Sequence, residues 1–212
     1  MSTTKSKEAP TKALPRTRLS RDARYRQLVD IAWRLVREEG TDALTLGRLA
    51  ERSGVTKPVV YDHFATRSGL LAALYQEYDA RQTALMDAAL TASKPTLNAK
   101  ATVIASAYID CVLTQGREVP GVSAALAGSP ELDEIIRNYH IVFIEKCRVV
   151  LSPFAKGKDI PLPGLWAMLG AAESLSNAAA IGHVTAAQAR DELFETIVAM
   201  VNRSARGDAR QG

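Results

Sequence analysis

The sequence has few of the residues from which metal sites and disulfide-stabilised folds are built. Only two of its 212 residues are cysteine, Cys111 and Cys147, and the three histidines lie in separate segments. Because no Cys or His pair has metal-ligand spacing, we expect reduced cysteines, no metal and no cofactor. This cysteine usage is typical of a reducing cytoplasm, which is the expected location.

Long apolar runs and catalytic motifs are also missing. No run approaches the roughly 18 residues that a membrane span needs, and no apolar segment follows the basic N-terminus as in a secretory signal. The sequence contains no Gly-x-Ser-x-Gly elbow, no Walker loop and no Gly-x-Gly-x-x-Gly fingerprint. These absences argue against a membrane protein and against an enzyme.

Positive charge is concentrated in the first third of the chain. Residues 1–67 carry 14 Lys/Arg and 8 Asp/Glu, whereas residues 68–212 carry 13 and 15. A basic segment attracts polyanions such as nucleic acid or acidic lipid, although from charge alone a solvated charged face is the simpler interpretation. Residues 1–19 have few large apolar side chains and are expected to be a disordered basic arm, either lying along nucleic acid or simply a flexible tail.

The rest of the sequence predicts an all-α fold. Apolar residues recur at helical spacing, as at Leu28, Ile31 and Leu35, and no strand-like alternation or internal repeat is present. The expected helices cover residues 20–39, 45–52, 56–64, 66–90, 97–114, 122–127, 130–151, 165–181 and 186–203. Residues 119–121 are expected to interrupt the helical structure, and residues 156–164 to form a loop.

Residues 45–64 carry the functional signal. Two short helices that cross steeply need a small residue at the crossing, which Ala50 supplies, and a turn residue free to adopt positive φ, which Gly54 supplies. Leu49, Val55 and Val60 anchor both helices to a core. This arrangement is typical of a helix-turn-helix.

The same segment resembles the tetracycline-repressor (TetR) family. Its members carry an Ala, then Gly-Val-Ser/Thr, then Tyr-x-His/Tyr-Phe and a following Lys. Here these are Ala50, Gly54-Val55-Thr56, Tyr61-Asp62-His63-Phe64 and, as a variant, Arg67. The resemblance covers residues 21–74 specifically. Beyond them it rests on length and helical character alone.

The resemblance implies a recognition helix over residues 56–64 that enters the major groove. Hydroxyl and N–H groups at helix starts would meet phosphates, Lys57 would pair with a phosphate or a guanine, and Asp62 would either point away from DNA or accept from a cytosine. The implied DNA-binding residues are Thr45, Thr56, Lys57, Pro58, Tyr61, His63 and Arg67.

The resemblance also implies how the chain is divided. Residues 1–19 are the arm, 20–66 the helix-turn-helix domain, 67–204 a helical effector-binding and dimerisation domain, and 205–212 a frayed tail. Two recognition helices must lie about 34 Å apart to read successive grooves, so we expect a homodimer. The last two helices are the expected interface, because their small residues permit close approach and the second has an apolar face too wide for one monomer core: Gly170, Ala171, Ala178, Ala179, Leu193, Phe194, Ile197, Val198, Met200 and Val201.

The middle helices are the expected ligand-sensing region. Tyr108, Cys111, Tyr139, Phe143 and Trp166 either line an apolar cavity or, residue by residue the simpler interpretation, fill a core. Asn177 and its neighbour Glu173 either contact a polar ligand group or face a partner chain or water.

These features together predict a ligand-responsive, DNA-binding transcriptional regulator. It would be a repressor that a small-molecule effector releases from a palindromic double-stranded DNA operator. The alternative is a DNA-binding helical protein with an architectural or adaptor role and no effector. A closed cavity in the C-terminal region would favour the first function, and a solid core the second.

Overall fold

The computed structural model describes residues 19–114, 118–156 and 159–206, and within these ranges it contains helices and no strand. The predicted all-α class is confirmed. Almost all of the predicted N-terminal arm and C-terminal tail lie outside the described residues. The elements are α1 (Arg21–Glu39), α2 (Leu46–Ser53), α3 (Lys57–Phe64), α4 (Arg67–Ala92), α5 (Leu97–Leu113), α6 (Glu118–Leu126), α7 (Pro130–Leu151), a short 3-10 turn η1 (Ser152–Phe154), α8 (Leu162–Ala180) and α9 (Ala186–Arg206).

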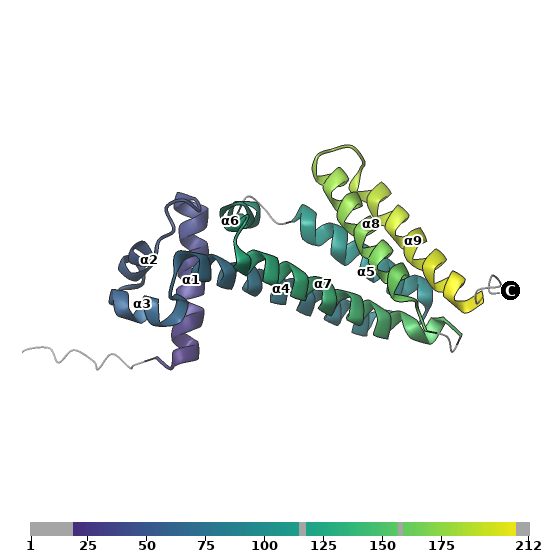
Figure 1. The fold of residues 1–212 in the computed structure, drawn as a ribbon, viewed down its shortest axis with the longest axis horizontal. Coiled ribbons are helices and arrows are strands. Elements are labelled where there is room, and N and C mark those ends of the chain that lie inside the picture. Colours follow the sequence, from purple (N-terminus) through teal and green to yellow (C-terminus); the bar gives the residue numbers. More distant parts are fainter. Residues whose placement is uncertain (1–18, 115–117, 157–158, 207–212) are drawn as a thin grey trace, which may run out of the picture.

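The molecule is elongated, with a small helical unit at each end (Figure 1). Helices α1, α2 and α3 cluster at one end, and α5, α8 and α9 at the other. Helices α4 and α7 lie along each other and connect the two ends. No helix in the described ranges has the length and apolar character needed to cross a membrane.

Helix boundaries follow local chemistry, and two of them correct the sequence-based prediction. Ser20 caps α1 by accepting from the Ala23 N–H at 3.2 Å, and Gly40 ends that helix at φ 84°. Residues 119–121, expected as a break, lie inside α6. Likewise α8 begins at Leu162 rather than Leu165. In both helices a proline occupies the first turn, where the missing N–H has no intrahelical partner to lose.

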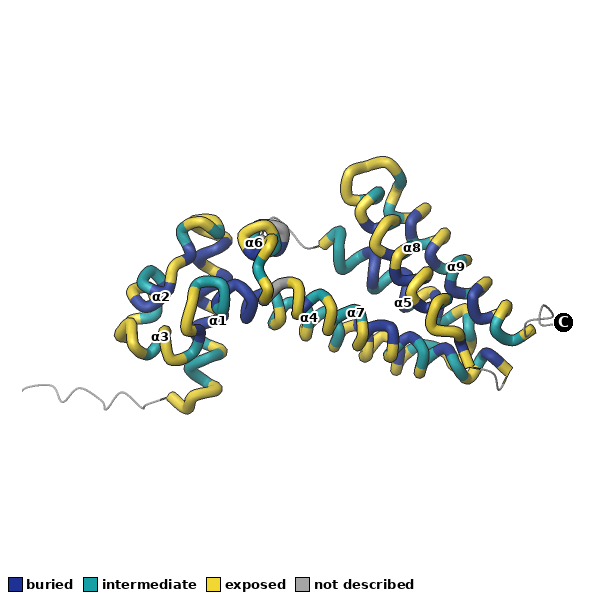
Figure 2. The backbone as a smooth tube through the Cα atoms, viewed as in Figure 1, coloured by how far each residue is buried: buried dark blue, intermediate teal, exposed yellow. Residues whose placement is uncertain are grey.

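Two separate hydrophobic cores lie along the chain, and α4 contributes to both (Figure 2). Its first half buries Leu70, Leu71 and Leu74 against α1, α3 and α6, whereas its second half buries Met86 and Leu90 against α5 and α7. Helix α6 belongs to the N-terminal core through three buried residues, Val119, Val122 and Leu126. The domain boundary between residues 66 and 67 remains a prediction, because the N-terminal core continues past it into the first half of α4.

Most of the apolar face of α9, which was expected to be surplus, is used within this single chain. Leu193, Ile197, Met200 and Val201 are buried in the core of this single chain, and Phe194 and Val198 pack against it. The reason is that α9 packs against both α5 and α8, and these two helices together cover its wide apolar face. Of the last two helices, α8 carries the large exposed apolar residues: Leu162 is 57% exposed, Trp166 44% and Ile181, just past its end, 61%.

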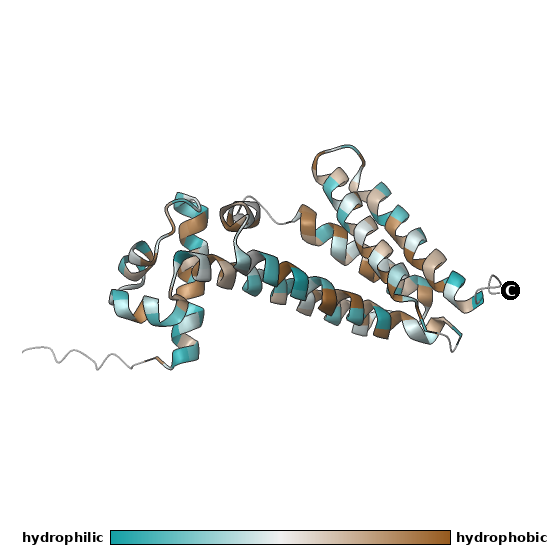
Figure 3. Ribbon diagram, viewed as in Figure 1, coloured by the Kyte–Doolittle hydropathy of each residue, from teal (hydrophilic) through white to brown (hydrophobic). Residues whose placement is uncertain are grey.

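Most helices in Figure 3 carry both polar and apolar residues, as expected for helices with one buried side.

Candidate nucleic-acid interface and ligand cavity

The turn between α2 and α3 has the geometry that residues 45–64 predict. Gly54 adopts the left-handed conformation at φ 63° and ψ 32°, and its N–H donates to the Glu51 carbonyl at 3.2 Å. Leu49 and Ala50 are buried beneath the turn. On α3, Val60 and Phe64 face the same core, which leaves the opposite side of α3 exposed.

That exposed side carries most of the predicted DNA-binding residues. Thr56, Lys57 and Pro58 are exposed at the start of α3, and Tyr61 is 51% exposed one turn later. The Thr56 hydroxyl makes no cap hydrogen bond to α3, in contrast to Thr45, whose Oγ1 accepts from the Arg48 N–H at 3.1 Å. The first turn of α3 therefore presents N–H groups, a hydroxyl and an ammonium group outward, which suits an anion.

His63 and Arg67 are placed differently from the other predicted contacts. The His63 ring is half-buried, with ring centroids 6.1 Å from Tyr25 and 6.0 Å from Phe64. The Arg67 guanidinium donates from Nε to the Leu44 carbonyl and from Nη2 to the Thr41 carbonyl, both at 2.8 Å. Arg67 thus fastens the start of α4 to the loop between α1 and α2, and both of these donors point into the protein.

Acidic residues at the end of α1 neutralise the arginines of α2. Arg48 pairs with Glu39 and Glu51, each at 2.8 Å, and Arg52 pairs with Glu38. The hydrogen bond from Arg48 lowers the pKa of Glu39, so this pair stays charged at neutral pH. Lys57 forms no ion pair with any described residue. It is the one lysine or arginine within α3 itself.

Sequence reasoning missed the start of α1 as part of this surface. Arg21 and Arg24 border a shallow hollow between α1 and α3, together with Asp62 and His63 of α3. Their signal in the sequence was only the summed positive charge of residues 1–67, which does not say which arginines lie beside the recognition helix.

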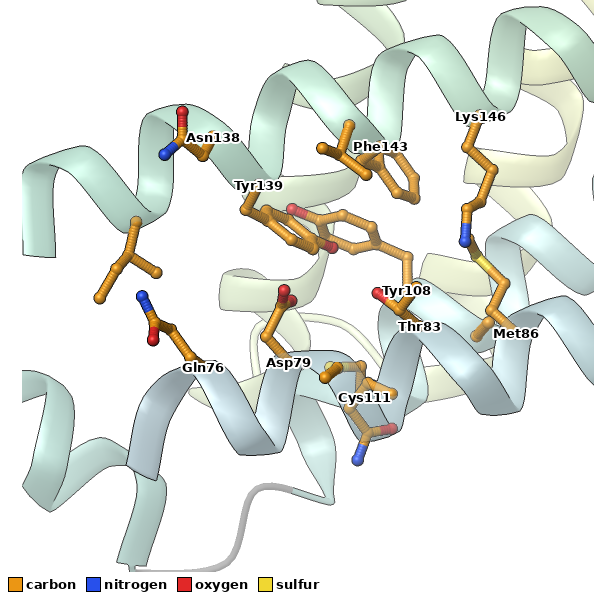
Figure 4. A pocket seen from close by; sticks show the side chains of 15 residues that line it. Gln76, Asp79, Thr83, Met86, Tyr108, Cys111, Asn138, Tyr139, Phe143 and Lys146 are labelled. Carbon is orange, nitrogen blue, oxygen red and sulfur yellow. The ribbon is translucent and has the colours of Figure 1, made fainter. Parts of the chain in front are cut away.

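A cavity of about 250 Å³ lies between α4, α5 and α7 (Figure 4). Four predicted ligand-site residues come together in its wall: Tyr108, Cys111, Tyr139 and Phe143. The Phe143 ring packs edge-on to Tyr108 at 5.1 Å and stacks on Tyr139 at 5.9 Å. Burial raises the pKa of both tyrosines, so their hydroxyls stay protonated at neutral pH.

The other two predicted ligand-site residues do not line this cavity. Trp166 is on the exposed side of α8, with its ring edge-on to His140 at 6.1 Å, and Asn177 is exposed further along the same helix. Glu173, between them, pairs with His140 Nε2 at 2.9 Å and so ties α8 to α7.

Sequence reasoning missed the polar part of the cavity wall. It comes from α4 and α7: Gln76, Asp79, Gln82, Thr83, Asn138 and Lys146. The available signal was the spacing of residues 76, 79 and 83, which places three polar side chains on one side of α4. That stripe alone looks like an ordinary solvated helix face.

Comparison with known proteins identifies the N-terminal unit. Residues 28–74 match the family described as bacterial regulatory proteins, tetR family. The curated HTH-type transcriptional activator FasR from Mycolicibacterium smegmatis is 38% identical over 61 residues. That match spans 29% of this chain and 28% of the length of FasR, so it concerns one domain of each protein.

Solved structures share the fold over most of the chain. A candidate transcriptional regulator from Pseudomonas aeruginosa PAO1 is 12% identical, with a TM-score of 0.69 over 90% of this chain and 96% of its own. The multidrug binding protein EbrR, complexed with imidazole, is 19% identical, with a TM-score of 0.58 over 82% of this chain and 89% of its own. At these identities the likeness concerns the arrangement of helices.

Proposed function

We propose that this chain is a DNA-binding regulator of the tetR family and not an enzyme, and that it binds a palindromic operator as a homodimer and leaves it when a small molecule occupies the cavity. The match of residues 28–74 to that family and the likeness to FasR support this proposal. The observation that carries this proposal is the exposed side of α3, where Thr56, Lys57 and Tyr61 face away from a helix that is otherwise anchored in the core.

The DNA step follows from that exposure. Helix α3 enters the major groove, where Lys57 pairs with a phosphate or with guanine O6 and N7. Thr45 and Thr56 meet phosphates at the starts of α2 and α3, and Tyr61 and His63 contact the backbone on either side. Pro58 packs against the sugar-phosphate backbone at the first turn. Arg67 is proposed to act differently from the family's lysine, by holding the corner between α3 and α4.

The dimerisation step uses α8. A second copy of the chain covers the exposed side of α8, where Leu162 and Trp166 lie one turn apart and Gly170 allows close approach in the following turn. No described atom lies within 4 Å of a Cβ built at Gly170. Pairing two chains in this way sets the separation of the two α3 helices, which must be about 34 Å or a multiple of it for both to reach major grooves.

The release step uses α4. This helix begins at the corner with α3, and its residues 76–86 line the cavity, so a ligand that changes how α4 and α7 pack also changes the placement of α3. The ligand shifts the equilibrium only by its difference in affinity for the two forms. The cavity is half open rather than closed, but it supports this function over an architectural role without an effector, and EbrR is an example of the same fold that binds small molecules.

Repression is the simplest direction of regulation, because a bound dimer excludes other proteins from the operator without any further contact. FasR, the curated relative, is named an activator. A reporter gene behind the selected operator tests the sign directly. Repression predicts higher reporter output when the regulator is deleted, and lower output on deletion would show activation.

The experiment that tests the function is selection of bound duplexes from a random DNA pool by the purified protein. We expect a bipartite palindrome. With that operator, Lys57→Ala should weaken binding about 10-fold or more and reduce the slope of log affinity against log salt by about 1. The matched control is Lys94→Ala, which removes the same charge from an exposed position just beyond the far end of α4. Equal operator binding by both variants would show that Lys57 does not contact the DNA. No enrichment of any duplex would overturn the function.

A further inference from the structure

The charges around the cavity are unbalanced. Among the described residues that line it, only Asp79 of α4 and Lys146 of α7 carry a full charge. Lys146 already has a partner, since its Nζ lies 2.5 Å from Asp87 Oδ1. Asp79 is half-buried and forms no ion pair or hydrogen bond with any described residue. The cavity wall therefore holds one carboxylate that has no direct partner among the described residues.

Aromatic and neutral groups surround that carboxylate. In Figure 4 the Asp79 side chain extends from α4 toward Tyr139 of α7 and Tyr108 of α5. Its charge is close enough to raise the pKa values of Tyr139, Tyr75 and Cys111. Burial in turn raises the pKa of Asp79. The positive charge of Lys146 lowers this pKa, but by less than burial raises it. A carboxylate kept in such surroundings gains most from a cation placed beside it.

The wall opposite Asp79 suits the rest of such a ligand. The rings of Tyr108, Tyr139 and Phe143 form a connected aromatic group, and Met86 adds a polarisable apolar side chain. Ring faces attract cations as well as apolar groups. A volume of about 250 Å³ lies near the lower end of the range for ligand pockets, which favours a compact molecule.

We propose that the cavity between α4, α5 and α7 takes a small organic cation, an amine or quaternary ammonium attached to an aromatic or apolar group, with Asp79 as the counter-ion and Tyr108 and Tyr139 beside the charged group. This inference rests on the proposed effector role of the same cavity and names its ligand class. It excludes carboxylate ligands, because their charge would face Asp79 while Lys146 is held by Asp87.

Three probes of nearly equal size test the sign of the charge: 2-phenylethylamine (cation), 2-phenylethanol (neutral) and phenylacetate (anion), each titrated calorimetrically into the full-length protein at pH 7. We expect the amine to bind about 10-fold or more tightly than the other two. Asp79→Asn should weaken amine binding about 10- to 100-fold while changing alcohol binding less than about 3-fold. Asp133→Asn, the same change at an exposed position on α7, should alter nothing.

Further variants separate a ligand contact from a folding defect. Circular dichroism spectra and melting curves should show that the Asp79→Asn variant is as helical as the parent chain and unfolds as cooperatively. Tyr139→Leu should lose more amine affinity than alcohol affinity, whereas Tyr139→Phe, which keeps the ring, should retain the preference.

The outcomes distinguish this inference from the proposed function. If phenylacetate binds as well as the amine, or if Asp79→Asn keeps the preference for the amine, the cationic class is wrong although the cavity can still hold an effector. If none of the three probes binds with a millimolar or better dissociation constant, the class is also overturned. Failure to select an operator would instead overturn the DNA-binding function and leave the probe titrations unaffected.

Discussion

The two ends of the molecule bury apolar side chains equally well but differ in what they tolerate. The N-terminal core contains two short helices, α2 and α3, held by tight turns in which particular residues are required by geometry. The C-terminal core joins long helices and leaves a cavity with a lone carboxylate in its wall. The first unit thus has the features of a fixed shape, and the second has room for a bound molecule.

The tightest point of the N-terminal unit is the corner between α3 and α4. Ala65 has a positive φ of 54°, unusual for a residue with a side chain. Four residues later, a Cβ added to Gly69 would collide with the carbonyl oxygen of Phe64. Because that oxygen belongs to the backbone, relief requires the two helices to move apart.

Gly69→Ala is therefore expected to have the largest effect. We expect a loss of about 2–3 kcal/mol from the unfolding free energy of the N-terminal unit, with loss of operator binding. Thermal unfolding followed by circular dichroism, together with operator titration, measures both. Gly47→Ala in α2 is the control, because the nearest atom to its added Cβ, Lys57 Cε, lies 3.8 Å away. Gly47→Ala should be neutral or stabilising by up to about 1 kcal/mol. Similar stability of the two variants would show that the corner is not constrained.

This difference in tolerance also explains how far the sequence could predict the molecule. Ala50 and Gly54 were identifiable because few residue types satisfy a steep crossing and a left-handed turn. Asp79 was not, because its position in a cavity wall depends on how α4, α5 and α7 are aligned in three dimensions. Periodicity shows which side of a helix is apolar but not which neighbour covers it, and for that reason the sequence did not show that most of the apolar face of α9 is covered by α5 and α8.

Substitution of Arg67 is expected to have the next largest effect on stability. It distinguishes a structural role of this residue from a contact with a DNA phosphate. If it fastens α4 to the loop after α1, Arg67→Met leaves the Thr41 and Leu44 carbonyls without these donors and costs about 2 kcal/mol. The slope of operator affinity against salt should then stay near that of the parent chain. If Arg67 instead contacts a phosphate, stability should hold and the slope should fall by about 1. Arg67→Lys, which keeps the charge but not the two-pronged geometry, should restore stability only in part.

Asp79→Asn should act in the opposite direction on stability, with the smallest magnitude. The pKa of Asp79 is raised in the folded state, so the folded chain binds the proton more tightly than the unfolded chain does. Stability from this group is thus greatest below the unfolded pKa of about 3.9, falls as pH rises through the folded pKa, and stays low at neutral pH.

Asparagine has no charge to desolvate, so the variant should be more stable at pH 7. Because Asp79 is half exposed to water, the gain is at most about 1 kcal/mol, or about 2–4 °C in melting temperature. The gain should vanish below about pH 4, where both chains are neutral at this position. Melting curves at pH 7 and pH 3.5 measure the difference. A variant that is more stable at pH 7 but binds cations poorly would mark Asp79 as a residue kept for binding at the expense of stability. A variant less stable at pH 7 would mean that Asp79 has a structural partner, and the contrast between the two ends of the molecule would then disappear.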